Sequence, residues 1–381
     1  MSSAPRKDHV PELDGLRAIA VLLVMWQHVP QGVLPRKIDV WGLSLVQPGY
    51  LGVDIFFVLS GFLITRILLV DSRAGLPLKN FLIRRFLRIF PIYYLTLAVI
   101  AIVRWGPELP WCAAYLANYY FAYTNTGGPL THTWSLSVEE HFYLVWPLLV
   151  YGLPRLAGRL VPWLVFLPIA LLSALHLTLQ IPAPAEDPEA FVAEVSSARS
   201  LMQQATHFRI ASLALGAVLA YGEGWFRSRP ARALPLGGLL FGAGYGQFLT
   251  GFLIVGDVAL PAWKPGFLPW VPAAFFVAFA LVSCSLVLAA VGLSGSRFPP
   301  VALLRTRALA FVGRISYGLY LYHLPVYFAL GLLHGRFAEP PSAGRVLLAV
   351  ALSFAVATLS YFVIERPILR YAARFRSRKP A

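Results

Sequence analysis

The chain has 381 residues, of which 58% are hydrophobic and only 13% are charged, and its mean hydropathy is +0.67. A soluble domain carries about 25% charged residues, so this sequence cannot cover a water-exposed surface, and much of it must lie in lipid. The net charge of +15 does not indicate nucleic-acid binding, because the basic residues fall in short clusters between apolar runs.

The apolar runs predict ten membrane-spanning helices, since each span needs about 20 mostly apolar residues. The runs lie near residues 14–33, 49–70, 88–104, 137–153, 161–180, 208–225, 233–255, 270–292, 308–333 and 344–368. We therefore expect an all-α polytopic membrane protein. A single membrane-embedded domain is expected to fill residues 1–381, with its helical core at about 12–370 and no appended soluble domain.

The distribution of lysine and arginine predicts the orientation of these helices. Ten spans place both termini on one side of the membrane, and that side carries about three times as many basic residues as the other. The positive-inside rule therefore predicts cytoplasmic termini and a multi-pass protein of the inner cell membrane. Loops 105–136 and 181–207 are expected outside. The oligomeric state is not predicted.

Polar side chains inside the first two spans predict a functional centre, because such groups are costly in lipid. Arg17 and His28 stand eleven residues apart, which places both on one helix face, about 16 Å apart along the axis. Asp54, in the second span, is expected at the depth of His28, where a carboxylate would fix the imidazole tautomer for general-base catalysis. A snorkelling arginine, a hydrogen-bonded core histidine and a structural ion pair are the alternatives.

A basic cluster, Arg84, Arg85 and Arg88, precedes the third span. Guanidinium groups bind phosphates in bidentate geometry, which would suit a phosphorylated ligand at the cytoplasmic surface. Positive charge at this place also anchors a helix to anionic lipid. Charge alone does not decide between the two.

Aromatic, imidazole and hydroxyl groups gather in the outer loop 105–136 and at the start of the fourth span. The tryptophans and tyrosines of this loop form either an interfacial belt or a stacking surface for a sugar. His132 and Ser135 lead into Glu139. We recognise no ligand spacing that predicts a metal site.

Six sequence blocks make the chain similar to the acyltransferase-3 family of membrane acyltransferases, from Glu12 to Pro367. The blocks are Arg17 with ten residues before His28, Gly-Val-Asp54-Ile-Phe-Phe-Val-Leu-Ser-Gly-Phe, Arg84-Arg85-Phe-Leu-Arg88-Ile-Phe-Pro91, Trp134-Ser-Leu-Ser-Val-Glu139, Ile-Ser316-Tyr317-Gly-Leu-Tyr320-Leu-Tyr-His323 and Glu365-Arg366-Pro367. One block alone would be weak, but six in order on a frame of ten helices are specific. Members of the family acylate O-antigens, peptidoglycan, periplasmic glucans and small glycosylated metabolites.

The resemblance implies an O-acyltransferase that moves an acyl group, with acetyl expected, from cytoplasmic acetyl-CoA or another acyl-CoA to a hydroxyl of an extracytoplasmic glycan. The implied residues are, for catalysis, His28, Asp54 and Glu139; for the CoA phosphates, Arg17, Arg84, Arg85, Arg88 and Arg314; and for the substrate, Ser60, Trp134, Ser135, Tyr317, Tyr320 and His323. His28 would act as general base or carry the acyl group covalently, with Asp54 or Glu139 orienting it.

Two other classes of function stay open. A transporter or flippase for a lipid-linked sugar would also use ten helices, buried charges and aromatic outer loops, although the paired broken helices of transporter repeats are not visible in the sequence. A membrane scaffold without catalysis would leave Arg17 and His28 unexplained.

Overall fold

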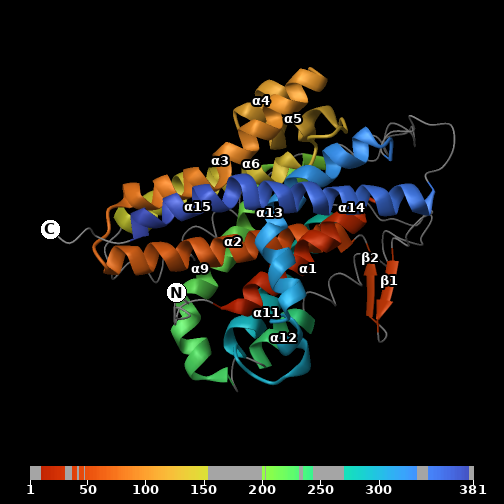
Figure 1. Cartoon of the computed structure of the whole chain (residues 1–381). Coiled ribbons are helices and arrows are strands. Elements are labelled where there is room, and N and C mark those ends of the chain that lie inside the picture. Colours follow the sequence, from red (N-terminus) through yellow and green to blue (C-terminus); the bar gives the residue numbers. More distant parts are fainter. Residues whose placement is uncertain are drawn as a thin grey trace.

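The computed structural model describes residues 10–30, 37–40, 43–46, 48–152, 200–201, 203–230, 235–242, 270–332 and 342–376. Within these ranges the chain is mainly helical (Figure 1). The longer helices are α1 (Pro11–Gln27), α2 (Pro48–Arg73), α3 (Leu78–Val103), α6 (Thr133–Gly152), α9 (Thr206–Ser228), α11 (Trp270–Gly292), α13 (Arg307–Ala329) and α14 (Ala343–Ser360). The shorter elements are α4 (Leu109–Ala113), α5 (Ala117–Thr124), α12 (Pro299–Leu303), the π-helical turn η3 (Tyr361–Glu365), α15 (Arg366–Ala372) and the 3-10 turn η4 (Ala373–Arg376).

One antiparallel hairpin departs from the all-α prediction. Strands β1 (Lys37–Val40) and β2 (Leu43–Val46) pair with Lys37 opposite Val46. They lie beside the far end of the helical bundle in Figure 1. These strands were not predicted, because a four-residue strand carries too little periodicity to be recognised in a sequence.

Three of the described helices are long and apolar enough to cross a bilayer on length and composition: Gly49–Arg73, Leu78–Val103 and Ala343–Phe375. The prediction of a helical membrane protein is confirmed at this level. The predicted span at 161–180 lies outside the described residues, and of 233–255 only 235–242 is described, as helix. The count of ten spans and the side of the termini therefore stay predictions.

The third helix begins earlier than the hydropathy pattern predicted. It starts at Leu78, ten residues before position 88, and runs to Val103. The predicted span left out these first turns because the basic cluster makes them too polar for a hydropathy pattern. The helix nevertheless includes them. All three arginines of the basic cluster, Arg84, Arg85 and Arg88, therefore lie on helix α3.

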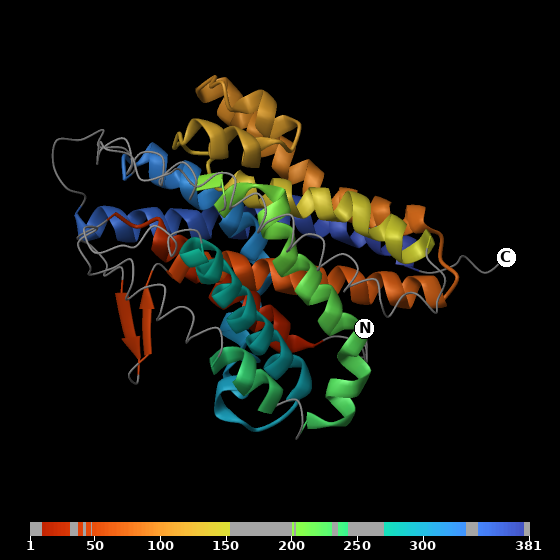
Figure 2. The ribbon, with the colours of Figure 1, turned by 180° about the vertical axis from the view of Figure 1, so that it is seen from behind.

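The directions of neighbouring helices agree with the predicted alternation of spans. Helices α1 and α13 run parallel, because Asp14 contacts Gly313 near their starts and His28 contacts His323 further along both. Helix α2 runs parallel to α9 and to α6. It runs antiparallel to α3, to which it is joined by a short turn (Figures 1 and 2).

Helices α2 and α9 cross at close range because both carry glycine at the crossing. Gly61 of α2 lies against the backbone of Leu213, and Gly216 of α9 lies against the backbone of Val58. Small residues let helix backbones approach closely in membranes, where dispersion and polar contacts replace the hydrophobic effect between helices. Because the two backbones meet at this crossing, the polar side chains on either side of it on α2 and α9 are brought close to each other.

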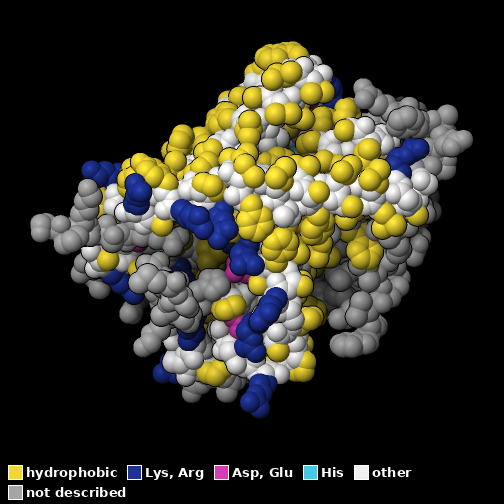
Figure 3. Space-filling view, in the orientation of Figure 1, with side chains coloured by type: hydrophobic (Ala, Val, Ile, Leu, Met, Phe, Trp, Pro, Cys, Tyr) yellow, Lys and Arg dark blue, Asp and Glu magenta, His cyan; other side chains and the backbone are white. Residues whose placement is uncertain are grey.

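Helices α14 and α15 form one long rod across the bundle through the π-helical turn η3 (Figure 1). Such a turn adds a residue to the helix and is frequent at functional sites. Here it ends at Glu365, which is buried and accepts a hydrogen bond of 3.2 Å from Ser360. Apolar residues on the outer faces of α3 and of the rod, such as Ile102 and Leu347, are exposed, and Figure 3 shows hydrophobic side chains over the upper part of this face.

The α2–α9 crossing yields a prediction about stability. Gly61→Ala would place a methyl group on the Leu213 backbone, and overpacking of this kind costs about 1–3 kcal/mol. We expect a lower unfolding temperature in detergent, measured by the reaction of the buried Cys112 and Cys284 with a thiol-reactive dye.

Gly224→Ala is the matched control on α9, since nothing lies within 4 Å of its Cβ position. It should keep or raise the transition temperature, because alanine is the better helix former. Equal transitions for the two variants would contradict the close contact.

Candidate active site

A cavity of about 240 Å³ opens between α1, α2, α3, α6 and α13. The predicted site residues that line it are Arg17, Ser60, Arg85, Arg88, Ser135, Glu139, Tyr317 and Tyr320. Residues from five helices far apart in the sequence therefore meet in one place. The other predicted site residues do not line this cavity.

Three arginines crowd one side of the cavity. Arg17 of α1 and Arg85 and Arg88 of α3 lie near enough to interact electrostatically with one another. Nε of Arg85 is buried and has no hydrogen-bond partner among the described residues. Like charges held together with an unused donor indicate a site for an anionic group. In Figure 3, basic side chains gather below the α14–α15 rod with acidic ones between them.

Arg84 and Arg314 do not belong to this cavity. Arg84 forms an ion pair with Asp71 and donates a hydrogen bond of 2.6 Å to the carbonyl of Phe375. It thereby ties the α2–α3 turn to the end of the C-terminal rod. Arg314 is exposed, and its guanidinium lies 6.0 Å from the ring of Phe311. A donor-binding role for either residue stays a prediction without support from these contacts.

Glu139 lies at the centre of the cavity wall and is held by three groups. Ser60 donates to Oε1 at 2.9 Å and Tyr143 donates to Oε2 at 2.7 Å, while Nη2 of Arg85 lies 4.0 Å from Oε2. The Arg85 guanidinium also stacks 3.7 Å above the Tyr143 ring. Tyr143 was not among the predicted residues, although it stands four positions after Glu139 on the same helix face.

Asp54 has a different partner from the one that the sequence suggested. We expected it to orient His28. Instead its carboxylate accepts a hydrogen bond of 2.8 Å from Arg209 and one of 2.6 Å from Ser212, both on α9. Asp54 and Arg209 are 0% and 1% exposed. The pair ties α2 to α9 inside the bundle, as a carboxylate buried in lipid requires a positive partner.

His28 ends α1 beside two other histidines. Nδ1 of His28 lies 3.1 Å from Nε2 of His323, and the ring of His132 lies 5.3 Å from that of His323. Nε2 of His132 lies 3.1 Å from the carbonyl of Leu321. The sequence placed His323 among the substrate-binding residues, and the structure places it against the predicted base. Among the described residues, no cluster of histidine, cysteine and carboxylate groups could hold a metal ion.

Tyr320 separates the cavity from the histidines. It lines the cavity, and its ring lies 5.9 Å from that of His323 and 5.4 Å from that of His132. Its hydroxyl lies 2.5 Å from Oγ of Ser135 and donates to the carbonyl of His132 at 3.0 Å. The contacts therefore run from the cavity through Tyr320 and His323 to His28, which does not line the cavity.

Trp134 was predicted as a substrate-binding residue and packs in the core. It is 5% exposed and meets the edge of the Phe57 ring at 6.0 Å. The fourth helix begins at Thr133 and not at 137, so this tryptophan belongs to the first turn of α6 and turns inward. Other aromatic residues of the loop are better candidates for an interfacial belt, since Trp105 and Tyr123 are both 74% exposed.

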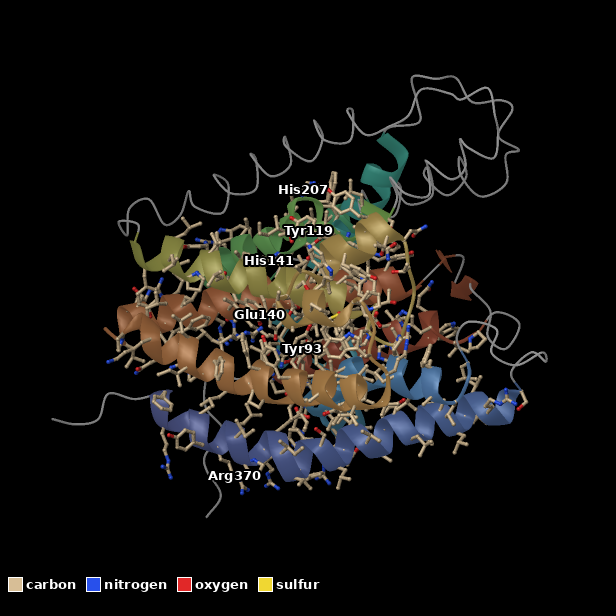
Figure 4. The ribbon with its side chains drawn as sticks, turned by 90° about the horizontal axis from the view of Figure 1, so that it is seen from above. Tyr93, Tyr119, Glu140, His141, His207 and Arg370 are labelled. Carbon is tan, nitrogen blue, oxygen red and sulfur yellow. The ribbon has the colours of Figure 1, made fainter. Side chains whose placement is uncertain are left out.

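A second polar group of side chains lies away from the cavity on α5, α6 and α9. Figure 4 shows Tyr119, His141 and His207 together on one flank, with Arg370 on the opposite flank. Nδ1 of His141 lies 2.6 Å from the hydroxyl of Thr206. This group is separate from the histidines that meet at His28.

Comparisons with known proteins identify the family of this chain. Residues 10–365 match the family described as acyltransferase domain. The chain belongs to this acyltransferase family. It is 32% identical to the peptidoglycan O-acetyltransferase OatA of Listeria monocytogenes, over 95% of this chain and 56% of that protein. It is 30% identical to the protein named putative peptidoglycan O-acetyltransferase YrhL in Bacillus subtilis, over 97% of this chain and 56% of that protein.

This member of the acyltransferase family spans little more than half the length of those curated relatives. No solved structure matches it. The resemblance drawn from the six sequence blocks is confirmed at the level of the family. The roles of single residues are not tested by the comparisons, and they rest on the contacts described above.

The buried pair of Asp54 and Arg209 yields a second prediction. Asp54→Asn leaves the arginine buried without its counter-charge, which costs about 3–5 kcal/mol. We expect a marked loss of folded protein, measured by size-exclusion chromatography and by thermal unfolding in detergent.

Replacing both partners by apolar residues of similar size, Asp54→Leu with Arg209→Met, should recover most of that stability. An Asp54→Asn protein as stable as wild type, with only its catalytic pH profile altered, would restore the expectation that this carboxylate serves His28.

Proposed function

We propose that this protein is a membrane O-acetyltransferase that moves an acetyl group from acetyl-CoA to a hydroxyl of a glycan outside the cytoplasm. The observation that carries the proposal is a cavity with three arginines on one side and Tyr320 on the other, behind which lies a cluster of histidines. The relatives reported above are named for O-acetyl transfer to peptidoglycan, which favours a cell-wall or surface glycan as the acceptor.

The donor would enter from the side of Arg17, Arg85 and Arg88. Guanidinium groups bind phosphates by charge-assisted hydrogen bonds, and CoA carries phosphates at the end remote from its thioester. A cavity of about 240 Å³ holds the acyl end of such a donor and not its nucleotide. The phosphates would then remain at the arginines, with the thioester directed towards Tyr320.

His28 would be the general base. It takes the proton of the acceptor hydroxyl, whose oxygen attacks the thioester carbonyl; the carbon–sulfur bond then breaks, and CoA leaves as a thiolate that recovers a proton. The alternative is an acyl group carried covalently on His28 before the hydroxyl attacks. Because Tyr320 stands between cavity and histidines, either course requires this side chain to turn aside or the thioester to reach past it.

Transport of a lipid-linked sugar is the other candidate function. The named relatives favour group transfer, and a cavity crowded with arginines suits a phosphorylated donor. Binding of acetyl-CoA to the purified protein separates the two functions, because a flippase has no need of it.

The donor site is tested by Arg88→Ala. Each charge-assisted contact contributes about 1.5–3 kcal/mol, so its loss should weaken acetyl-CoA binding by about tenfold or more. Isothermal titration calorimetry on the protein in detergent measures this. Arg73→Ala is the control, since Arg73 is an exposed arginine at the end of α2 and does not line the cavity. Equal affinity of the two variants would assign the cluster to lipid anchoring.

The catalytic site is tested by His28→Ala. General-base catalysis contributes about 10²–10⁴-fold to a rate, so transfer should fall by that factor while acetyl-CoA still binds at the arginines. The measurement is release of CoA in proteoliposomes with a glycan acceptor, together with mass spectrometry of surface glycans from cells that express each variant. Turnover near that of wild type would move the role of base to another residue, with Glu139 and His132 next in order.

A further inference from the structure

Glu140 of α6 lines the cavity, and its Oε1 atom is buried without a hydrogen-bond partner among the described residues. In Figure 4 it lies between His141 and Tyr93, on the side of α6 that faces α3. The adjacent Glu139, by contrast, is held by two hydroxyl groups. A buried polar atom that folding leaves unsatisfied is costly, so its presence in the cavity wall calls for a ligand or a water.

The tyrosines around Glu140 do not satisfy it. Three of them lie near enough to interact with it electrostatically. Tyr94 and Tyr317 donate to backbone carbonyls instead, and the hydroxyl of Tyr115 is buried without a partner in the described part of the chain. The described side chains therefore do not supply the donor that Glu140 lacks.

An unused donor accompanies this unused acceptor. Arg85 lies near enough to Glu140 for their charges to interact, and Nε of Arg85 is buried with no hydrogen-bond partner within the described ranges. Its Nη2 atom lies 4.0 Å from Oε2 of Glu139. A phosphate oxygen would satisfy the donor and leave the acceptor unpaired, with a second negative charge beside it. An amide satisfies both atoms, because its N–H donates and its carbonyl accepts.

We propose that Glu140 and Arg85 recognise an amide in the pantetheine arm of the acetyl donor. The amide N–H donates to Oε1 of Glu140, and the amide carbonyl accepts from Nε of Arg85. This inference rests on the proposed function, and it makes Glu140 a specificity-determining residue for donors that carry a pantetheine arm. The phosphates of the donor then lie at Arg17 and Arg88.

The spacing along α6 fits an arm of this length. Ser135, whose Oγ lies 2.5 Å from the Tyr320 hydroxyl, precedes Glu140 by five positions, or about 7.5 Å along the helix axis. In acetyl-CoA four bonds separate the thioester carbonyl carbon from the nearest amide nitrogen, a span of about 5 Å, and the hydrogen bond to Oε1 adds about 3 Å. An amide held at Glu140 therefore brings the thioester to the level of Ser135 and Tyr320.

Two ligands and two substitutions separate this role from packing. Phospho-ADP, the nucleotide end of CoA, carries its phosphates and lacks the pantetheine arm. We expect Glu140→Leu to weaken acetyl-CoA binding by about tenfold or more, the loss that follows removal of a hydrogen bond to a charged group. Its affinity for phospho-ADP should stay within about twofold of wild type, because the phosphate contacts remain. Glu140→Gln keeps an accepting oxygen and should hold acetyl-CoA within about fivefold of wild type. Isothermal titration calorimetry in detergent measures all of these.

The controls address folding and position. Glu140→Leu removes an unsatisfied buried oxygen, so it should keep or raise the thermal unfolding temperature in detergent. Tyr115→Phe removes the neighbouring unused hydroxyl, which does not line the cavity, and should leave both affinities unchanged.

The possible outcomes separate this inference from the function on which it rests. Unchanged acetyl-CoA affinity in Glu140→Leu overturns the inference and assigns the unused oxygen to water. Equal weakening of both ligands also overturns it, because Glu140 then supports the whole site and not the arm. A Glu140→Gln protein that binds acetyl-CoA as weakly as Glu140→Leu overturns recognition of an amide. Wild-type protein that binds no acetyl-CoA overturns the proposed function, and the amide site with it.

Discussion

The cost of an unpaired charge in a low-dielectric interior is the constraint on which this structure depends. Asp54 and Arg209 are both buried, and they lie 2.8 Å apart between α2 and α9. Further along the same helices, Arg66 and Glu223 pair at 2.7 Å. Together with the glycine crossing between them, these pairs hold α2 and α9 in register. Helix α2, which lines the cavity, is therefore positioned by its contacts with α9, and of these paired residues only Arg66 also lines the cavity.

The arginines of the cavity show the opposite arrangement. Arg17, Arg85 and Arg88 lie close together on one side of the site. Their acidic neighbours differ: Arg17 lies 3.8 Å from Asp14, Arg85 lies 4.0 Å from Glu139, and Glu365 is near Arg88. The mutual repulsion of the arginines is unfavourable for the protein alone, and an anionic ligand relieves it. A site of this kind gains affinity from charges that folding has already brought together. This is the physical reason to place the phosphorylated donor here and the neutral acceptor beyond Tyr320.

The sequence predicted the types of residue at the site better than their pairings. Arg17 was identified because polar groups in apolar helices are costly, Arg88 because it belongs to a basic cluster, and Glu139 through the resemblance to the family, and all three line the cavity. The partner of Asp54 was missed, because Arg209 follows it by 155 positions and helix periodicity says nothing about which helices become neighbours. Arg84 was grouped with its neighbours on the chain. It stands one turn before Arg88 on the same helix, nearer the α2–α3 turn, and it meets Asp71 across that turn.

The same constraint governs the carboxylates that were expected beside His28. A carboxylate beside a buried imidazole stabilises the imidazolium, and an imidazolium has no lone pair with which to accept a proton. The two carboxylates expected from the sequence to orient His28 have other partners, Asp54 bonding to Arg209 and Glu139 to Ser60 and Tyr143. In this bundle Asp54 therefore serves the packing of α2 against α9, and of the two carboxylates only Glu139 lines the cavity.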